Sequence, residues 1–439
     1  MLYSIGFFIF SLIYLPVLIF KGKLHAEFGE RFAMFDKMKE RQLLSSKGRI
    51  WIQAVSVGEV ALCKGLVSAL KEKFPDRDIV ISTITKAGND LAKKIFSKDV
   101  VIIYFPLDFL FLVKKTVNIV KPSLYIMIET EVWPNLLREL SSRNIPSALI
   151  NGRISDRSIG KYRLARPFLK RVLGRINIFC MQDTVDADRV LELGAPADKI
   201  KVTGNMKFDQ DTPANIKDPD CIRASFGLRE DEDLFVAGST HEGEEEIILE
   251  VYKKLSGDFP SLRLLIAPRH INRVAEIEKV IKNAGLESAR VSKLNESRLS
   301  AEAKGESALA KEEITNHESR ILILDTIGHL NDAYSIGTVV FIGGSLVRHG
   351  GHNPIEPAFF SKPILFGLYM FNFKYITNAF LKNKAAIQVF GKEDLYEKLR
   401  LLLNDANIRN TLGQSAKKVV VENRGATQRN IAQITGILR

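Results

Sequence analysis

Short apolar runs rich in β-branched residues alternate with amphipathic stretches along most of the chain, and this alternation is the strongest constraint on its fold. It predicts an α/β protein whose parallel sheets are covered by helices on both faces. The amphipathic stretches include 60–74 and 133–143. The predicted strands of the first half are Ile50–Val55, Asp78–Thr83, Val100–Phe105, Leu124–Ile128, Ala148–Ile150, Ile176–Met181 and Lys201–Thr203.

The pattern of strands restarts once, which predicts two domains. A chain of 439 residues, 46% of them hydrophobic, can bury two substantial cores. The stretch Asp209–Pro219, with three Asp and two Pro, is the predicted linker, and the polar stretch Ser288–Arg320 is expected to be a solvated excursion. The second series of predicted strands is Leu234–Ala237, Leu264–Ala267, Ile321–Leu324, Val339–Ile342, Pro363–Phe366 and Ile387–Phe390.

The first twenty residues are predicted to form a membrane anchor. Leu2–Phe20 carries no charge, and Lys21, Lys23, His25 and Arg31 follow it. About 20 apolar residues are needed to span a bilayer, and positive residues after the segment would place the rest of the chain in the cytoplasm. A buried first helix is the alternative. We therefore expect an anchor at 1–20, a Rossmann-like domain at 21–208 and a second one at 209–439, whose last helices are candidates for packing back on the N-terminal domain.

The composition restricts the partners. The formal net charge of +12 favours acidic ones, which include nucleic acid, anionic lipid and phosphorylated substrates. The three cysteines (Cys63, Cys180 and Cys221) are far apart and form no CxxC pair, so neither a disulfide framework nor a zinc site is indicated.

The most informative motif is GGSLVRHGGHNPIEPA, at 343–358. It follows a predicted strand, contains two glycine pairs and leads through Asn353-Pro354 into a predicted helix. Glycines allow close approach to a ligand, and a helix N-terminus attracts anions. The motif therefore predicts a nucleotide-sugar phosphate site, with Glu356 available to sugar hydroxyls. It matches neither GxGxxG nor a Walker loop, which disfavours a Rossmann oxidoreductase.

Acidic and basic motifs follow the strands of the first half. Ser56-Val-Gly-Glu59 opens a predicted helix, where it is either a capping box or a carboxylate that acts as general base. Glu129 and Glu131 lie just after another predicted strand. From Arg153 to Arg175 there are eight Lys or Arg and one acid. That run is either a solvated face or a surface for lipid head-group phosphates.

In the second half, GSTHEGEE (238–245), APRH (267–270) and DTIGHL (325–330) also follow predicted strands. Arg269 is the predicted phosphate clamp. Asp231-Glu-Asp233 has the spacing of a DxD metal site but precedes a strand, so we interpret it as a solvated loop and predict no metal.

Together these strings resemble the Kdo transferase family, which moves 3-deoxy-D-manno-octulosonic acid (Kdo) from CMP-Kdo to a lipid A precursor, lipid IVA. The matching strings, found in order over both halves, are AVSVGE (54–59), ETEVWPN (129–135), NGRISDRS (151–158), GNMKFD (204–209), GSTHEGEE, APRH, DTIGHL and GGHNPIEPA (350–358). The resemblance implies a GT-B fold with two Rossmann-like domains facing a cleft. It implies an inverting transfer without metal or other cofactor, at the cytoplasmic face of the bacterial inner membrane.

The resemblance also implies residue roles. Glu59 would be the general base, assisted by Glu129 or Glu131. The implied partners are CMP-Kdo, lipid IVA and anionic lipids of the inner membrane, with no nucleic acid. The donor-binding residues would be Pro268, Arg269, Ile327, Gly328, Leu330, Gly351, Asn353 and Glu356. The acceptor-binding residues expected beside the base, including those of the basic run, are Ser56, Gly58, Arg153, Arg157, Arg163, Arg166 and Lys170.

The sequence departs from the family pattern at Gln53, at His329 and at Leu368-Tyr369, where the family usually has His, Glu and Pro-His. We expect these departures to affect rate and donor preference more than fold. Alternative functions are another GT-B transferase such as a lipid A disaccharide synthase, a nucleotide-sugar epimerase, or a catalytically inactive protein that binds anionic lipids. The motifs do not determine the number of Kdo units, the acceptor acylation or the oligomeric state.

Overall fold

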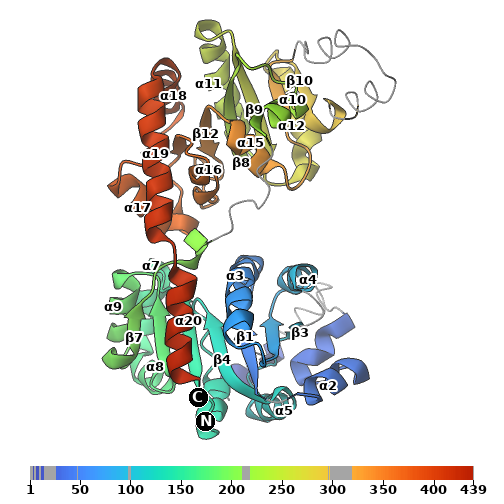
Figure 1. Cartoon of the computed structure of the whole chain (residues 1–439), viewed down its shortest axis with the longest axis vertical. Coiled ribbons are helices and arrows are strands. Elements are labelled where there is room, and N and C mark those ends of the chain that lie inside the picture. The colour runs from blue at the N-terminus through green and yellow to red at the C-terminus, as the bar shows by residue number, and fades with distance from the viewer. Residues whose placement is uncertain are drawn as a thin grey trace. The chain divides into compact units, whose positions relative to one another are not determined.

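The computed structural model describes residues 3, 6–8, 11–13, 26–46, 48–96, 100–209, 218–294, 296 and 319–438. It divides into two compact units, Met1–Gln210 with Asn423–Arg439, and Asp211–Glu422 (Figure 1). Most of the predicted linker lies outside the described residues, and so does most of the predicted anchor at 1–20. Among the helices that are described, none is long and apolar enough to cross a membrane, so the structure gives the predicted transmembrane helix no support.

The first unit is built on a seven-stranded sheet, ordered β3-β2-β1-β4-β5-β6-β7, in which every pair of neighbours is parallel. The strands are β1 Arg49–Gln53, β2 Ile79–Thr83, β3 Val100–Tyr104, β4 Pro122–Ile128, β5 Ser147–Gly152, β6 Ile178–Met181 and β7 Ile200–Val202. The helices are η1 Ala26–Phe32, α2 Lys37–Leu44, α3 Val57–Lys73, α4 Lys86–Ile95, α5 Leu110–Val120, α6 Pro134–Ser142, α7 Asp156–Leu164, α8 Arg166–Leu173, α9 Thr184–Glu192, η2 Ala197–Lys199, η3 Met206–Asp209 and α20 Ala426–Ile437.

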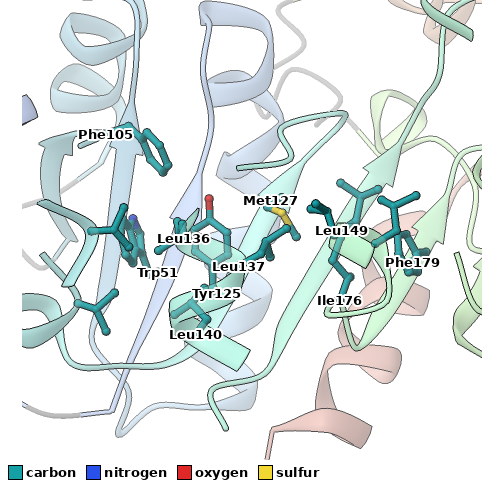
Figure 2. Close-up of a cluster of buried hydrophobic side chains, with 14 of the residues drawn as sticks. Trp51, Phe105, Tyr125, Met127, Leu136, Leu137, Leu140, Leu149, Ile176 and Phe179 are labelled. Carbon is teal, nitrogen blue, oxygen red and sulfur yellow. The ribbon is translucent and has the colours of Figure 1, made fainter. Parts of the chain in front are cut away.

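Both faces of this sheet are buried, which is why its strands are apolar almost without interruption. On one face Trp51, Tyr125 and Leu149 pack with Leu136 of α6 in one core cluster (Figure 2). On the other face Ile50 and its neighbours pack against α3 and α20. Adjacent residues of β1 and β4 alternate between the two clusters, as the pleat of a strand requires.

The second unit repeats this architecture with the strand order β10-β11-β9-β8-β12-β13-β14, again parallel throughout. Its strands are β8 Asp233–Thr240, β9 Leu262–Pro268, β10 Ser288–Arg290, β11 Ile321–Ile323, β12 Val339–Ile342, β13 Ile364–Phe366 and β14 Ile387–Gln388. Its helices are α10 Pro219–Ser225, α11 Glu244–Asp258, η4 Ile271–Arg273, α12 Val274–Asn283, α15 Leu330–Ile336, α16 Ile355–Phe359, η5 Phe371–Phe373, α17 Lys374–Lys382, α18 Lys392–Asn404 and α19 Ala406–Asn423.

The structure confirms the predicted parallel α/β architecture and corrects one segment. The stretch expected to be a solvated excursion, Ser288–Arg320, begins with β10, which pairs with β11. Val291 and Leu294, just after β10, are buried. Most of the remaining stretch lies outside the described residues. Its polar composition hid a short edge strand, because an edge strand is covered less completely than a central one.

The last helix, α20, packs on α3 and β6 of the first unit (Figure 1). Its N-cap is Gly425, which has no side chain to satisfy the free N–H groups of the first turn. Asp209 takes that role from 216 positions earlier in the chain. Its carboxylate accepts hydrogen bonds from the backbone N–H of Gly425 at 2.7 Å and of Thr427 at 2.5 Å.

We predict that Asp209→Ala lowers the free energy of unfolding by about 1–2 kcal/mol, because it leaves these two N–H groups without an acceptor. The loss should be measured by urea denaturation, and hydrogen exchange should rise along α20. Asp209→Asn, which keeps one side-chain oxygen, is the matched control and should lose less. Equal stability of all three proteins would show that the cap contributes nothing.

Candidate functional site

Each sheet has one place where the strand order reverses, and the predicted motifs lie there. In the first unit β1 has β2 on one side and β4 on the other, and the next strands continue outward from each. Ligands of open α/β sheets bind beyond the carboxyl ends of the strands at such a switch point. Ser56 and Glu59 follow β1, while Glu129 and Glu131 follow β4. The fold therefore brings Glu59 close to Glu129 and Glu131, although they lie about 70 positions later in the sequence.

Glu59 does not form the capping box that its spacing allowed. In a capping box the Ser side chain would accept from the Glu59 backbone N–H, and the Glu side chain would accept from the Ser56 N–H. Here Ser56, the N-cap of α3, makes no side-chain cap. It donates to the Glu59 carboxylate instead (Oγ–Oε1 3.1 Å), and Glu59 Oε2 accepts from the backbone N–H of Val55 at 2.8 Å.

The pKa of Glu59 is raised to about 7, chiefly because the carboxylate is largely removed from water. The negative charges of Glu129 and Glu131 raise it further, and the hydrogen bonds from Val55 and Ser56 oppose the rise. A carboxylate with a pKa near neutrality is suited to exchanging a proton with a substrate hydroxyl.

Glu129 and Glu131 are held by the loop between β4 and α6. Glu129 has a left-handed backbone (φ 61°), an uncommon conformation for a residue with a side chain, and its N–H donates to Ile150 O. Glu131 Oε2 accepts a hydrogen bond from Trp133 Nε1 at 3.1 Å. Burial raises the pKa of Glu131, and the charge of Glu129 adds to that rise. The two acids predicted to assist Glu59 are thus positioned differently. A hydrogen bond from Trp133 orients the side chain of Glu131, whereas the left-handed backbone at Glu129 sets the direction of its side chain.

The sequence motifs included Lys207 without assigning it a role, and the structure places it electrostatically close to Glu129 and Arg153. Burial lowers the pKa of Lys207; the charge of Glu129 opposes this and that of Arg153 adds to it. Asn151, another motif residue, holds the start of η3 close to the end of β5, because its side chain accepts a hydrogen bond from the N–H of Met206 at 2.9 Å. Motif membership was the only available signal for either residue.

The predicted acceptor residues fall into two groups. Ser56 and Gly58 lie at the N-terminus of α3 beside Glu59, and Arg153 follows β5, the neighbour of β4. Arg157, Arg163, Arg166 and Lys170 lie on α7 and α8 and are exposed. Arg163 pairs with Glu192 of α9 (Nε–Oε1 2.5 Å), and Arg166 donates to the backbone oxygen of Glu192 at 2.8 Å. The basic run therefore carries less uncompensated charge than its sequence indicated.

The switch point of the second sheet lies between β8 and β12 and collects histidines. Nε2 of His241, after β8, is 2.8 Å from Nε2 of His352. The ring of His349 stacks on His241 with 4.1 Å between centroids, and His270 approaches His241 edge-on at 6.0 Å. The pKa of His241 and of His352 is lowered to about 4, first by burial and then by neighbouring positive charge that includes Arg269. Both rings are thus neutral at pH 7.

The first glycine pair of the 343–358 motif has a structural role, because the loop that contains it is held by a buried glutamate. Glu244, fully buried, accepts hydrogen bonds from the backbone N–H of Gly344 (2.6 Å), Ser345 (2.9 Å), Leu346 (2.9 Å) and His241 (3.0 Å). These donors face a protein carboxylate and are already satisfied. An anion at this site must therefore use other donors, such as Arg269 and the nearby histidines.

The other predicted donor residues surround this corner. Pro268 ends β9, and Arg269 after it is exposed. Gly351 has φ 72°, and a side chain there would meet Met370, so glycine is required. Asn353 Nδ2 donates to Glu356 Oε1 at 3.2 Å, and burial raises the pKa of Glu356 although Arg269 opposes it.

The loop after β11 presents the remaining predicted donor residues. Gly328 has φ 96°, and Leu330 begins α15. Ile327 is 86% exposed. Its side chain is therefore open to contact with a ligand.

The three departures from the family pattern have different surroundings. Gln53 is fully buried at the end of β1, and its Oε1 accepts from Ser82, so it supports the sheet. His329 is exposed, with Nδ1 3.1 Å from Asp332 Oδ2. Leu368 and Tyr369 follow β13 and are 48% and 37% exposed. Only the last two sites offer side chains that a ligand can reach.

The described part of the chain contains no group of three or more His, Cys, Asp or Glu side chains arranged to hold a metal ion. Cys63 and Cys180 are buried, and Cys221 is exposed.

We predict that Glu244→Gln lowers the free energy of unfolding by about 2–4 kcal/mol, because an amide cannot replace the carboxylate toward four N–H donors and each unsatisfied buried donor costs about 1–3 kcal/mol. Glu242→Gln, two residues away and exposed, is the matched control and should change stability by less than about 0.5 kcal/mol. Urea denaturation measures both. Similar small losses in the two variants would rule out the proposed structural role.

Comparison with known proteins places these features in a family. Residues 26–210 match the family described as 3-deoxy-D-manno-octulosonic-acid transferase (kdotransferase). The chain is 35% identical to a 3-deoxy-D-manno-octulosonic acid transferase of Haemophilus influenzae over 87% of its length and 85% of the relative's. It is 31% identical to the transferase of that name from Rickettsia felis, over 82% of the chain and 73% of the relative.

Among solved structures, a glycosyltransferase from Rickettsia africae superposes with a TM-score of 0.58, covering 90% of this chain and 99% of that one at 14% identity. At that identity the likeness shows the fold, and two parallel α/β units are the GT-B fold expected from the sequence. The 35% identity over most of both chains shows more. The chain belongs to the 3-deoxy-D-manno-octulosonic acid transferase family and is a glycosyltransferase.

Proposed function

We propose that this enzyme transfers Kdo from CMP-Kdo to the lipid A precursor lipid IVA in lipopolysaccharide biosynthesis. Family membership supports the reaction, and one structural observation supports an active enzyme over an inactive lipid-binding protein. That observation is the cluster of three acids at the β1/β4 switch point, in which the pKa of Glu59 is raised to about 7. Like charges in a cluster repel each other, and removing one of them from water costs further free energy. Groups with pKa values shifted in this way are concentrated at functional sites.

In the proposed reaction Glu59 is the general base. Its carboxylate takes the proton of an acceptor hydroxyl as that oxygen forms a bond to the anomeric carbon of Kdo. The bond from that carbon to the CMP phosphate breaks, and its electron pair leaves with CMP. Direct displacement of this kind inverts the anomeric centre. Glu129 or Glu131 assists, and the hydrogen bond between Trp133 and Glu131 favours Glu131 as the better positioned of the two.

The donor is assigned to the second unit. Arg269 is the proposed partner of the CMP phosphate, and His241 and His352 are its neutral neighbours. An arriving phosphate favours protonation of such rings, so the site gains positive charge when it is needed. The leaving group is a phosphomonoester that these groups can stabilise, so the proposal includes no metal or other cofactor. The remaining proposed contacts are Gly351 and Asn353 to the phosphate, Glu356 to the ribose, and Pro268, Ile327, Gly328 and Leu330 to the rest of CMP.

The acceptor is assigned to the first unit and to the inner membrane at its cytoplasmic face. Among the described residues near the N-terminus, Phe8, Leu12 and Ile13 are 53%, 59% and 67% exposed, which suits contact with lipid. We propose that Ser56, Gly58 and Arg153 contact the acceptor sugar beside the acids. Arg157, Arg163, Arg166 and Lys170 would contact its phosphates or anionic lipids.

The activity is tested by incubating the full-length enzyme with CMP-Kdo and detergent-dispersed lipid IVA. Mass spectrometry should show lipid IVA heavier by one or more Kdo residues, which also counts the units added, together with release of CMP. Transfer from a UDP-sugar instead of CMP-Kdo would point to another GT-B transferase, such as a lipid A disaccharide synthase. Retention of lipid without any transfer would identify a binding protein.

We predict that Glu59→Gln lowers kcat/KM for transfer by about 10²–10⁴-fold, the usual contribution of a general base, with CMP binding retained. In the wild type kcat/KM should rise with pH through about 7 and level off above it, because the base acts only when deprotonated. Glu72→Gln, exposed near the other end of α3, should behave as wild type. Residual activity of Glu59→Gln within about tenfold of wild type would return Glu59 to a structural role.

A further inference from the structure

An apolar cavity lies beside the acidic loop of the first unit. Its volume is about 250 Å³, and its walls include Val132 and Trp133 of the loop, Leu149 of β5, Tyr162 of α7, and Phe168 and Leu169 of α8. Phe168, at 42% exposed, places one side of the cavity at the surface, whereas Leu149 is buried in the core (Figure 2). The cavity thus runs from the surface toward the interior.

The lining determines what the cavity can hold. Apolar cavities bind water poorly, and an apolar cavity of about 150 Å³ is large enough to admit benzene. The present one is larger and has mostly hydrocarbon and aromatic walls. Its occupant should therefore be apolar, and a flexible hydrocarbon chain fits a cavity whose walls come from several elements.

Trp133 connects the cavity to the proposed catalytic acids. Its indole ring forms part of the wall, and its N–H donates to Glu131. Thr130, from the same loop, also lines the cavity, and its hydroxyl donates to the backbone oxygen of Arg153. The side chain of Trp133 therefore contacts both the cavity and Glu131, so it would lie between a ligand in the cavity and this acid.

The surface around the open side combines apolar and basic groups. Leu164, at the end of α7, is 88% exposed and lies close in sequence to Phe168. The same two helices carry further exposed basic residues, namely Arg157, Lys161, Arg163, Arg166, Lys170 and Arg171. Exposed apolar and basic groups on the same two helices match a molecule with a hydrocarbon tail and an anionic head.

We propose that this cavity holds part of one acyl chain of the lipid acceptor while the acidic cluster engages the acceptor sugar. The proposal rests on the proposed function, because it assigns the acceptor's apolar part to the same site. It explains why an apolar cavity adjoins a charged loop. It also gives the enzyme a means to select acylated acceptors over soluble sugars, since the apolar contribution is lost when the chain is absent.

The first test fills the cavity. Leu169→Trp should lower kcat/KM for detergent-dispersed lipid IVA at least tenfold, while transfer to the same phosphorylated disaccharide without acyl chains stays within threefold of wild type. Leu191→Trp, the same substitution at a 45% exposed position of α9, is the matched control and should change neither. Phe168→Ser, at the exposed side, should show the same selective loss even if Leu169→Trp fails to fold.

The outcomes separate the two proposals. Equal loss on acylated and deacylated acceptors, or loss on neither, overturns the assignment of the cavity while leaving the transferase function standing. No transfer by the wild type to any acceptor overturns the proposed function, and occupancy of the cavity is then decided by the second test.

The second test uses the fluorescence of the two tryptophans, Trp51 and Trp133. Trp51 is fully buried, whereas Trp133 lines the cavity. A phosphatidic acid with brominated acyl chains, dispersed in non-ionic detergent, should quench the wild-type emission by contact with Trp133. In Trp133→Phe the remaining emission should be quenched much less. Equal fractional quenching in both proteins would show that no acyl chain enters the cavity.

Discussion

Parallel pairing within each sheet determines where this enzyme can do chemistry. Because all strands of a sheet run in one direction, every strand ends at the same edge, and the following loops meet there. The strand order then reverses once, between β1 and β4 in the first unit and between β8 and β12 in the second. At these places adjacent loops diverge and leave room for a ligand. The acids of the first unit and the histidines of the second both lie at such a point.

Glu244, fully buried, and Glu59, partly buried, show how the same side chain can have different roles. Glu244 accepts four backbone N–H groups, and its charge organises the loop after β12. Glu59 accepts only one backbone N–H and one hydroxyl, and two further carboxylates lie near it. Burial raises both pKa values, but only Glu59 has neighbours that make its ionised form still less favourable. The number of donors thus separates the structural carboxylate of Glu244 from the carboxylate that we propose to be the base.

The fold could be predicted from the sequence because its central strands are buried on both faces and are therefore apolar over their full length. β10 was missed because its three residues, Ser-Ala-Arg, are only half-buried and show no such pattern. The acids and Arg269 were found because their motifs follow strands. Glu244 was not singled out, because its partner Gly344 lies 100 positions later, and nothing local marks such a contact. The pairing of Arg163 with Glu192 was hidden for the same reason.

The cavity beside Trp133 could not be predicted from the sequence. Its energetic cost nonetheless indicates a function. Its walls come from Tyr3 near the N-terminus and from elements between β4 and α9, and most of the lining residues are apolar or aromatic side chains with no motif in common. A closed cavity costs about 24 cal/mol per Å³, so one of 250 Å³ would cost about 6 kcal/mol, and an open one less. That is a large fraction of the 5–15 kcal/mol that stabilises a typical protein. Stability alone would favour filling it, so a cavity kept open next to the proposed catalytic acids is better explained by a ligand that fills it in use.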